Sequence, residues 1–276
     1  MAGTLYVVAT PIGNLADASP RAIDTLRGVQ LVACEDTRTS RVLLARHGVA
    51  TRTVALHEHN ERAATDKLLG VLSEGGSVAL VSDAGTPAVS DPGARLVEAA
   101  HRAGIAVIPI PGPSAAIAAW SAAGFAADRF LVAGFLPAAR GARRAALDAL
   151  DPEVPLVLYE APHRVDDTIA DLLACFGGER EIVFGRELTK KFEETARMPL
   201  SAAAAWLAAG PHRHQGEYVL VLGPGSGIAD ARAAEGERVL GILLESLPAS
   251  DAAKLAARIT GAARNALYRS ALGRGK

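Results

Sequence analysis

The segment from Ser82 to Gly93 contains residue types that could hold a small polar ligand. Its sequence, Ser-Asp-Ala-Gly-Thr-Pro-Ala-Val-Ser-Asp-Pro-Gly, follows a short apolar run typical of a strand. Glycine and proline let a backbone approach a ligand closely at defined dihedral angles, and Asp83 and Thr86 could hydrogen-bond a ribose or an amino group. A plain strand–helix turn in which Asp91 caps the helix would explain the same composition, so this segment alone leaves both interpretations open.

Two other turns after apolar runs have similar features. The turn Thr10–Asn14 has neither the glycine spacing of a dinucleotide-binding loop nor the GK[ST] end of a P-loop, so a ligand there should lack phosphates. A nucleoside with an amino-acid tail fits that description. The turn Pro111–Ala115 precedes a helical pattern whose exposed amide groups suit a carboxylate or a hydroxyl, although Ser114 as a simple helix cap accounts for the same residues. Three such turns indicate a ligand site better than any one of them.

Polar side chains cluster at further strand ends, but their spacing favours neither a metal site nor a hydrolase triad. Glu35 and Asp36 follow one predicted strand, and Glu160 ends another. His57 and His59 are two residues apart instead of four, and no cysteine lies near them in the sequence, so we expect no metal site. The sequence has no GxSxG elbow for a serine nucleophile.

Strands alternate with helical patterns in both halves of the chain. Strands are expected at Leu5–Ala9, Val29–Cys34, Ser77–Ser82, Ile105–Ile110, Phe130–Phe135, Val154–Glu160, Glu181–Gly185 and Glu217–Leu222. Helices are expected after Ser19, from Asp91 to about Arg102, after Ser114, and at Val165–Cys175 and Ser201–Ala208. A short basic loop is expected at Pro137–Arg144. This alternation favours an α/β fold with a mainly parallel sheet, which would place the three turns at the carboxyl ends of strands.

Turn signals divide the chain into three parts. The Pro-Gly-Pro turn near residue 112 predicts one α/β domain over residues 1–112 and a second over residues 113–228. A glycine-rich break then leads to a small helical appendage of three short helices over residues 235–276, with breaks expected at Pro248–Asp251 and at Thr260–Gly261. From Ala252 onward the chain has six basic residues and no acidic ones, so this part could bind phosphates although the net charge of the chain is -1.

The overall composition narrows the class of protein. Half of the residues are hydrophobic but 4% are aromatic, so aliphatic side chains must fill the core. The two cysteines, Cys34 and Cys175, are too few for a disulfide framework. We expect no leader sequence and no membrane span, which together favour a cytoplasmic protein.

Taken in order, these segments resemble the tetrapyrrole-methylase superfamily. The matching segments are Leu5–Leu15, Glu35–Arg38, Ala55–Asn60, Leu80–Pro87, Pro109–Ser114, Gly134–Pro137, Tyr159–Glu160, His163–Arg164, Arg186–Lys190, Gly216–Glu217 and Lys254–Leu272. The resemblance implies two α/β domains of the class III methyltransferase type with S-adenosylmethionine in the cleft between them. Within the superfamily the chain is similar to enzymes that methylate the 2′-hydroxyl of a decoding-centre cytidine in 16S rRNA. The glycine-rich first loop of the superfamily is replaced here by Thr10–Gly13.

The same resemblance implies which residues form the site. Contacts to the cofactor are expected from Pro11, Ile12, Gly13, Asp83, Ala84, Gly85, Thr86, Ser114, Ala115, Tyr159 and Glu217. Because a ribose hydroxyl is a weak nucleophile, a general base would accelerate transfer by about 10²–10⁴-fold. The candidates are Glu35, Asp36, His57, Glu160 and Glu217. Glu160 is slightly favoured because His163 and Arg164 follow it closely.

The implied substrate is 16S rRNA in the small ribosomal subunit, and family members commonly form homodimers. Contacts to RNA phosphates are expected from Arg140, Arg143, Arg144, Arg186, Lys190, Lys254, Arg258, Arg264 and Arg269. One alternative is a methyltransferase for a tetrapyrrole or another small molecule, which would share the fold but has no need of a basic helical tail. The other is a non-enzymatic RNA-binding assembly factor, which would need the basic surface but no cofactor cleft.

Overall fold

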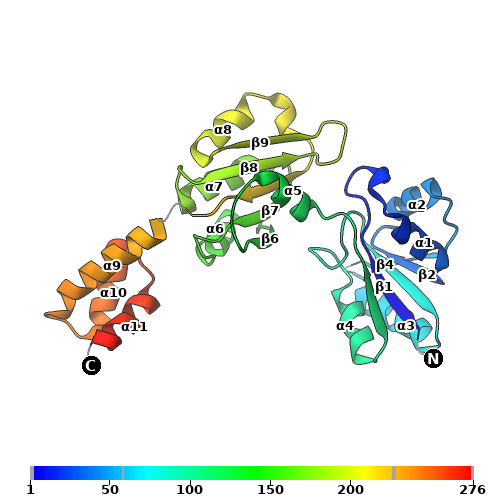
Figure 1. Ribbon diagram of the computed structural model, residues 1–276, viewed down its shortest axis with the longest axis horizontal. Coiled ribbons are helices and arrows are strands. Elements are labelled where there is room, and N and C mark those ends of the chain that lie inside the picture. The colour runs from blue at the N-terminus through cyan, green and yellow to red at the C-terminus, as the bar shows by residue number, and fades with distance from the viewer. Residues whose placement is uncertain (1–2, 58, 226–227, 275–276) are drawn as a thin grey trace.

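The computed structural model describes residues 3–57, 59–225 and 228–274. Over these ranges the chain forms two five-stranded sheets, each covered by helices, followed by a group of three helices (Figure 1). None of the helices in the described ranges is long and apolar enough to cross a membrane.

The first sheet is parallel and has the strand order β3-β2-β4-β1-β5. Its strands are β1 (Thr4–Val8), β2 (Leu31–Cys34), β3 (Thr53–Ala55), β4 (Ser77–Val81) and β5 (Ala106–Ile110), and its helices are α1 (Pro20–Gly28), α2 (Thr37–Arg46), α3 (Glu61–Ser73) and α4 (Ala94–Arg102), with a 3-10 turn η1 (Leu15–Asp17). Because β4, β1 and β5 are neighbours, the turns that follow them meet at one edge of the sheet. The parallel arrangement expected from the sequence is confirmed here.

The second sheet differs from that expectation. Its strands are β6 (Leu131–Phe135), β7 (Leu156–Glu160), β8 (Glu181–Arg186), β9 (Glu194–Pro199) and β10 (Tyr218–Leu222), in the order β6-β7-β10-β8-β9. The strands β6 and β7 are parallel, whereas β10 is antiparallel to both of its neighbours and β9 is antiparallel to β8. The β8–β9 connection is a short hairpin loop, which permits antiparallel pairing alone.

The helices of the second unit are α5 (Ala115–Ala123), α6 (Arg140–Asp148), α7 (Val165–Phe176) and α8 (Leu200–Ala208), with a 3-10 turn η2 (Pro211–His214). One buried cluster packs Leu147, Ile169 and Leu207 against one face of the sheet, and α5 supplies Ala116 and Ala119 to a cluster on the other face. The expectation of a loop over Pro137–Arg144 is wrong from Arg140 onward, where α6 begins. This part is helical because Leu147 and the aliphatic part of Arg143 are buried on one side of that helix.

In the first unit, the start of α1 agrees with the sequence prediction, whereas the start of α4 does not. Ser19 caps α1 as expected, since its side chain accepts a hydrogen bond from the backbone N–H of Ala22. The expectation that Asp91 caps the next helix is wrong. The helix α4 begins at Ala94, and its N-cap is Gly93 at φ +120°, a conformation that glycine adopts without strain.

The last three helices, α9 (Ile228–Leu244), α10 (Ala249–Thr260) and α11 (Arg264–Arg274), pack on one another. Their buried cluster includes Leu240, Ala253 and Leu267 and, among the described residues, draws its members from these helices and the loops between them. The breaks expected at Pro248 and Gly261 are confirmed, as α10 has these residues at its two caps.

Candidate functional site

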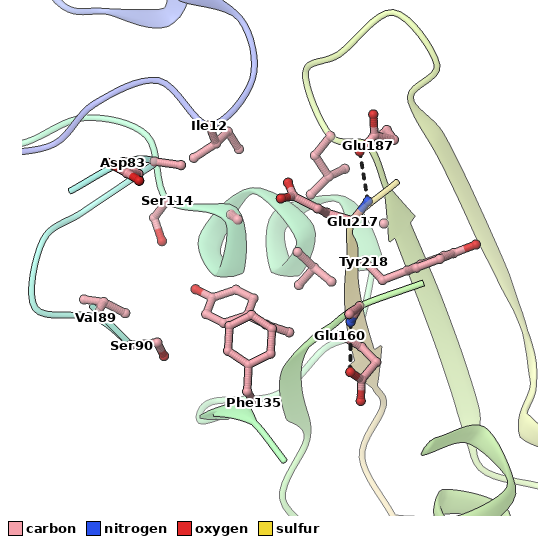
Figure 2. A pocket seen from close by; sticks show the side chains of 18 of the residues that line it. Ile12, Asp83, Val89, Ser90, Ser114, Phe135, Glu160, Glu187, Glu217 and Tyr218 are labelled. Atoms are coloured by element: carbon pink, nitrogen blue, oxygen red, sulfur yellow. Dashed lines mark hydrogen bonds between the residues drawn. The ribbon is translucent and has the colours of Figure 1, made fainter. Parts of the chain in front are cut away.

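A cavity of about 480 Å³ lies between the two sheets, with walls contributed by both (Figure 2). The first unit supplies Ile12, Asp83, Ala84, Gly85, Thr86, Val89, Ser90 and Asp91, and the start of α5 supplies Ser114 and Ala115. The rest of the second unit supplies Phe135, Tyr159, Glu160, Ala161, Pro162, His163, Gly185, Glu187, Leu188, Lys190, Glu217, Tyr218 and Val219. Figure 2 shows Asp83 and Ser114 on one side and Glu187 and Glu217 on the other.

Most of the residues expected to contact a cofactor line this cavity. They are Ile12, Asp83, Ala84, Gly85, Thr86, Ser114, Ala115, Tyr159 and Glu217. Pro11 and Gly13 belong to the same first turn but do not line the cavity, and Pro11 is buried. Glu160 and Lys190 line it as well, whereas Glu35 and Asp36 do not.

Hydrogen bonds join the three strand-end turns into one floor. The backbone N–H of Thr10 donates to the carbonyl of Gly85 at 2.8 Å, and the N–H of Gly85 donates back at 3.1 Å. The hydroxyl of Thr86 donates to the carbonyl of Pro113 at 3.1 Å. A side chain at Gly112 would bring its Cβ within 3.0 Å of the Cβ of Ala9, so glycine permits the close approach of the third turn to β1. Turns far apart in the sequence therefore form one continuous surface.

The edge of the cavity beside β2 and β4 is acidic. Asp83 and Asp91 line the cavity, and the backbone N–H of Asp36 donates to Oδ1 of Asp83 at 3.0 Å. Burial, and then the charge of Asp83, raise the pKa of Asp91. Burial, together with the charges of Asp83 and Asp91, also raises the pKa of Glu35. Such a concentration of carboxylates favours a ligand that carries positive charge.

Asp36 is unsuited to accepting a proton at neutral pH. Hydrogen bonds from the side chain and backbone of Arg38 lower the pKa of Asp36 to about 2. Its side chain also accepts from the backbone N–H of Arg38 as the N-cap of α2. The geometry thus gives Asp36 a capping role at the start of that helix.

Glu160 lies at the end of β7 with its carboxylate occupied by protein donors. Oε2 accepts from the hydroxyl of Thr168 at 2.5 Å, and Oε1 accepts from the backbone N–H of Ala161 at 2.8 Å. Nε of Arg164 lies 3.2 Å from Oε1, and the residue is 2% exposed. These contacts fix the β7–α7 turn and hold the carboxylate inside the wall of the cavity.

Lys190 joins two carboxylates on the opposite wall. Its Nζ donates to Oε1 of Glu187 and to Oε2 of Glu217, both at 2.8 Å. Although partial burial opposes it, these hydrogen bonds raise the pKa of Lys190. The loop that carries Lys190 has two non-glycine residues in the left-handed region, Glu187 at φ +50° and Thr189 at φ +67°.

This loop also reaches the first unit. A Cβ added to Gly13 would lie 2.5 Å from Cγ of Lys190 and 2.9 Å from Oγ1 of Thr189. The β8–β9 loop is therefore in close contact with the first strand-end turn, and Figure 1 shows the hairpin extending toward the blue N-terminal segment. Gly13 allows this contact because it has no side chain.

The basic residues expected to contact RNA fall into three groups by exposure. Arg143 and Arg186 are almost fully buried, so neither presents its charge at the surface. Arg143 donates to Asp171 at 2.8 Å, while Arg186 donates to the backbone carbonyls of Gln215, Phe192 and His212. The exposed group consists of Arg140, Lys254, Arg258, Arg264 and Arg269, and the partly buried group consists of Arg144 and Lys190.

Val89, Ser90 and Phe135 line one rim of the cavity. Val89 and Ser90 belong to the Ser82–Gly93 segment that predicts a ligand site, but their residue types give no separate signal. Phe135 belongs to the Gly134–Pro137 segment of the family resemblance, and no pattern in the sequence indicates where its side chain points. In the part of the chain that the structure describes, no group of three or more His, Cys, Asp and Glu residues is arranged to hold a metal ion.

Two family models match the chain. The model described as Tetrapyrrole (Corrin/Porphyrin) Methylases matches residues 4–204. The model described as RsmI C-terminal HTH domain matches residues 230–275, which contain α10 and α11.

Relatives similar along nearly the whole chain have one name, Ribosomal RNA small subunit methyltransferase I. The protein of Pseudomonas aeruginosa is 49% identical, with 99% of this chain and 98% of that protein covered. The protein of Escherichia coli O157:H7 is 46% identical, with 98% of this chain and 95% of that protein covered.

Solved structures share the two-sheet fold at low sequence identity. A uroporphyrin-III C-methyl transferase from Thermus thermophilus, complexed with S-adenyl homocysteine, has a TM-score of 0.56 and 18% identity over 80% of this chain and 97% of that one. Diphthine synthase has a TM-score of 0.58 and 16% identity over 80% of this chain and 89% of that one.

Proposed function

The chain belongs to the tetrapyrrole methylase family, and on this basis we propose that it methylates the RNA of the small ribosomal subunit with S-adenosylmethionine as methyl donor. The relatives that match it from end to end are named for that activity. The finer proposal is that the acceptor is the 2′-hydroxyl of a decoding-centre cytidine in 16S rRNA. It includes the assembled small subunit as substrate, a homodimeric enzyme and a cytoplasmic location.

The cavity between the sheets is the observation that supports this proposal. Its volume of about 480 Å³ is in the range of small-ligand sites. The floor lacks a phosphate-binding loop, which suits a nucleoside whose tail is an amino acid. The carboxylates of Asp83 and Asp91 suit the positive charge of a sulfonium or an ammonium group. The amides at the start of α5, next to Ser114, suit a carboxylate.

For methyl transfer, the protein has to align the cofactor with the ribose hydroxyl and to accept the proton of that hydroxyl. Bound S-adenosylmethionine would supply a methyl group attached to a positively charged sulfur. The leaving group would be the rest of the cofactor, as a neutral thioether. When the ribose oxygen forms its bond to the methyl carbon, the carbon–sulfur bond breaks and the hydroxyl proton must pass to an acceptor. Holding two reactants in line lowers the barrier by roughly 7–11 kcal/mol. The two walls of the cavity come from separate sheets and can position one reactant each.

Among the candidate carboxylates, Glu217 best fits the role of proton acceptor. It lines the cavity and its side chain is 80% exposed, unlike that of Glu160. Lys190 holds its Oε2 at 2.8 Å and so fixes the direction of the group. The ammonium of Lys190 would also stabilise negative charge that develops on the ribose oxygen.

Two measurements on the full-length protein test the function. Calorimetry with S-adenosylmethionine should give binding to one site per chain. Purified small subunits from cells that lack the protein should then take up labelled methyl groups at one ribose of 16S rRNA. Methylation of a precorrin but not of the subunits would identify a small-molecule enzyme. The absence of cofactor binding would favour an assembly factor.

A further inference from the structure

Phe135 is an exposed aromatic side chain at the rim of the cavity. It ends β6, is 59% exposed and lines the cavity at its lower edge in Figure 2. A large apolar ring left in water at a ligand site is unfavourable unless a ligand covers it.

The backbone of β6 is distorted so that this ring reaches the cavity. The pairing of β6 with β7 shifts register between Val132 and Gly134, which is a bulge, and Gly134 has φ +66°. A Cβ at Gly134 would lie 2.8 Å from Oγ of Ser90 in the first unit. Glycine is therefore required both by the conformation and by the contact between the two units. Bulges of this kind re-aim the next side chain, and here the next side chain is Phe135.

The facing loop of the first unit presents a second apolar group. Val89 is 41% exposed and lies between Ala88 at φ +62° and Ser90 at φ +64°. Two non-glycine residues in the left-handed region are strained, and such strain collects at ligand sites. Figure 2 shows Val89 and Ser90 to the left of Phe135, with Ser90 the nearer of the two.

Tyr159 supports the Phe135 ring from the side of the sheet. Their ring centroids are 5.5 Å apart with an angle of 51° between the planes. Tyr159 is partly buried and burial raises the pKa of its phenol, so this ring is a fixed and neutral support. The orientation of Phe135 is thus set before a ligand arrives, which lowers the entropy lost on binding.

We propose that Phe135 stacks on the base of the nucleotide whose ribose is methylated, with Val89 in contact with that nucleotide from the opposite side. This inference rests on the proposed function. A ribose within a stacked RNA strand cannot enter a cavity of this size, so the target nucleotide has to leave its stack. Splayed-out RNA bases stack on aromatic side chains. The rim is where a macromolecular substrate arrives, whereas the enclosed floor of Gly85 and Thr86 suits the small cofactor.

Substitutions at Phe135 test this proposal against a matched control. Leu131 lies on the same strand, is 41% exposed and does not line the cavity. Because one base–aromatic stack contributes roughly 1–3 kcal/mol, Phe135→Ala should raise the KM for small subunits by about 5- to 150-fold. Phe135→Leu should show a similar rise, because it retains apolar area but no ring. Phe135→Trp should keep the wild-type KM, and Leu131→Ala should change nothing.

The dissociation constant for S-adenosylmethionine, measured by calorimetry on each variant, shows whether Phe135 contacts the RNA or the cofactor. It should stay at the wild-type value, and melting temperatures should match that of Leu131→Ala. A weaker cofactor affinity in Phe135→Ala with an unchanged KM for the subunits would assign the ring to the cofactor and overturn the proposal. So would a Phe135→Ala enzyme with the wild-type KM. Wild-type protein that binds the cofactor but leaves small subunits unmethylated would overturn the proposed function, and this inference with it.

Discussion

The hydroxyl of Thr168 donates a hydrogen bond to Oε2 of Glu160 at 2.5 Å, and both side chains are buried. The bond links the end of β7 to the first turn of α7. Glu160 thereby serves the β7–α7 connection, and its carboxylate has protein donors on both oxygens.

Glu160→Gln should therefore destabilise the protein and leave the chemical step nearly intact. The amide removes the negative charge beside Arg164 and keeps one acceptor oxygen for two protein donors, at a cost of about 1–3 kcal/mol in the free energy of unfolding. Urea denaturation and single-turnover methylation measure the two effects. Thr168→Val, which removes the partner hydroxyl, should give a similar loss of stability. A hundredfold slower single turnover in folded Glu160→Gln would instead make Glu160 the proton acceptor.

Glu217→Gln should slow single-turnover methylation by about 10²–10⁴-fold, the usual contribution of a general base. Binding of the small subunit should change little, because Lys190 keeps its second partner, Glu187. Glu193→Gln is the control, since Glu193 is an exposed residue of the same loop and does not line the cavity. Equal rates in the two variants would exclude Glu217 as the acceptor.

Asp171 compensates the positive charge of a buried arginine. Its side chain and that of Arg143 are 1% and 2% exposed, and they lie 2.8 Å apart. Removing one partner of a buried pair leaves an uncompensated charge, so Asp171→Asn should lower the free energy of unfolding by about 3–5 kcal/mol. Asp167 lies 4.0 Å from Arg143 with its side chain 81% exposed, so Asp167→Asn should cost far less. Equal losses would show that burial of Asp171 does not matter.

The stabilisation from Asp171 should also depend on pH. Although burial alone would raise it, hydrogen bonds from Arg143 and Arg140 hold the pKa of Asp171 below its ordinary value of 3.8. The folded-state pKa lies below the unfolded one, so the stabilisation is complete above the ordinary value and is lost as pH falls through the folded-state pKa. The difference in unfolding free energy between wild type and Asp171→Asn should be constant near neutral pH. It should shrink in acid, and a constant difference down to pH values well below the ordinary pKa would contradict this.

Removing residues 226–276 should weaken binding to RNA and leave cofactor binding unchanged. The helices α9, α10 and α11 have their own buried cluster, so their loss exposes little of the two sheets. Filter binding to small subunits at several salt concentrations measures the effect. Replacing Lys254, Arg258, Arg264 and Arg269 by alanine should also flatten the dependence of affinity on salt, because each lost phosphate contact removes about one unit of slope. Arg102→Ala removes an exposed arginine on α4 and is the control.

The floor of the site could be predicted because it depends on the order of elements in the chain. A ligand-suited turn after each of three parallel strands has to lie at one sheet edge, which places Asp83, Thr86 and Ser114 together. Glu35 follows a fourth strand of that sheet yet lies outside the cavity, because β2 is separated from β1 by β4. Position at the end of a strand is thus not sufficient to place a residue in the cavity.

The second wall could not be predicted, since it depends on packing between distant residues. The basic residues Arg143 and Arg186 look like surface groups in the sequence, yet each satisfies buried acceptors supplied by residues 5 to 29 positions away. The direction of Phe135 depends on a bulge at Gly134 and on contact with Ser90, neither of which leaves a local pattern. Antiparallel β10 likewise lies between two strands that precede it in the chain.

Among the described residues, the buried clusters of the first unit end at Ile110 and those of the second begin near Ala115. Heating can therefore melt the two halves in separate steps while the site between them is empty. A molecule that binds both walls acts as a non-covalent cross-link, because neither half can unfold without releasing it. Tight occupancy should merge the two calorimetric transitions into one, so that the shape of the melting curve reports whether the site is filled.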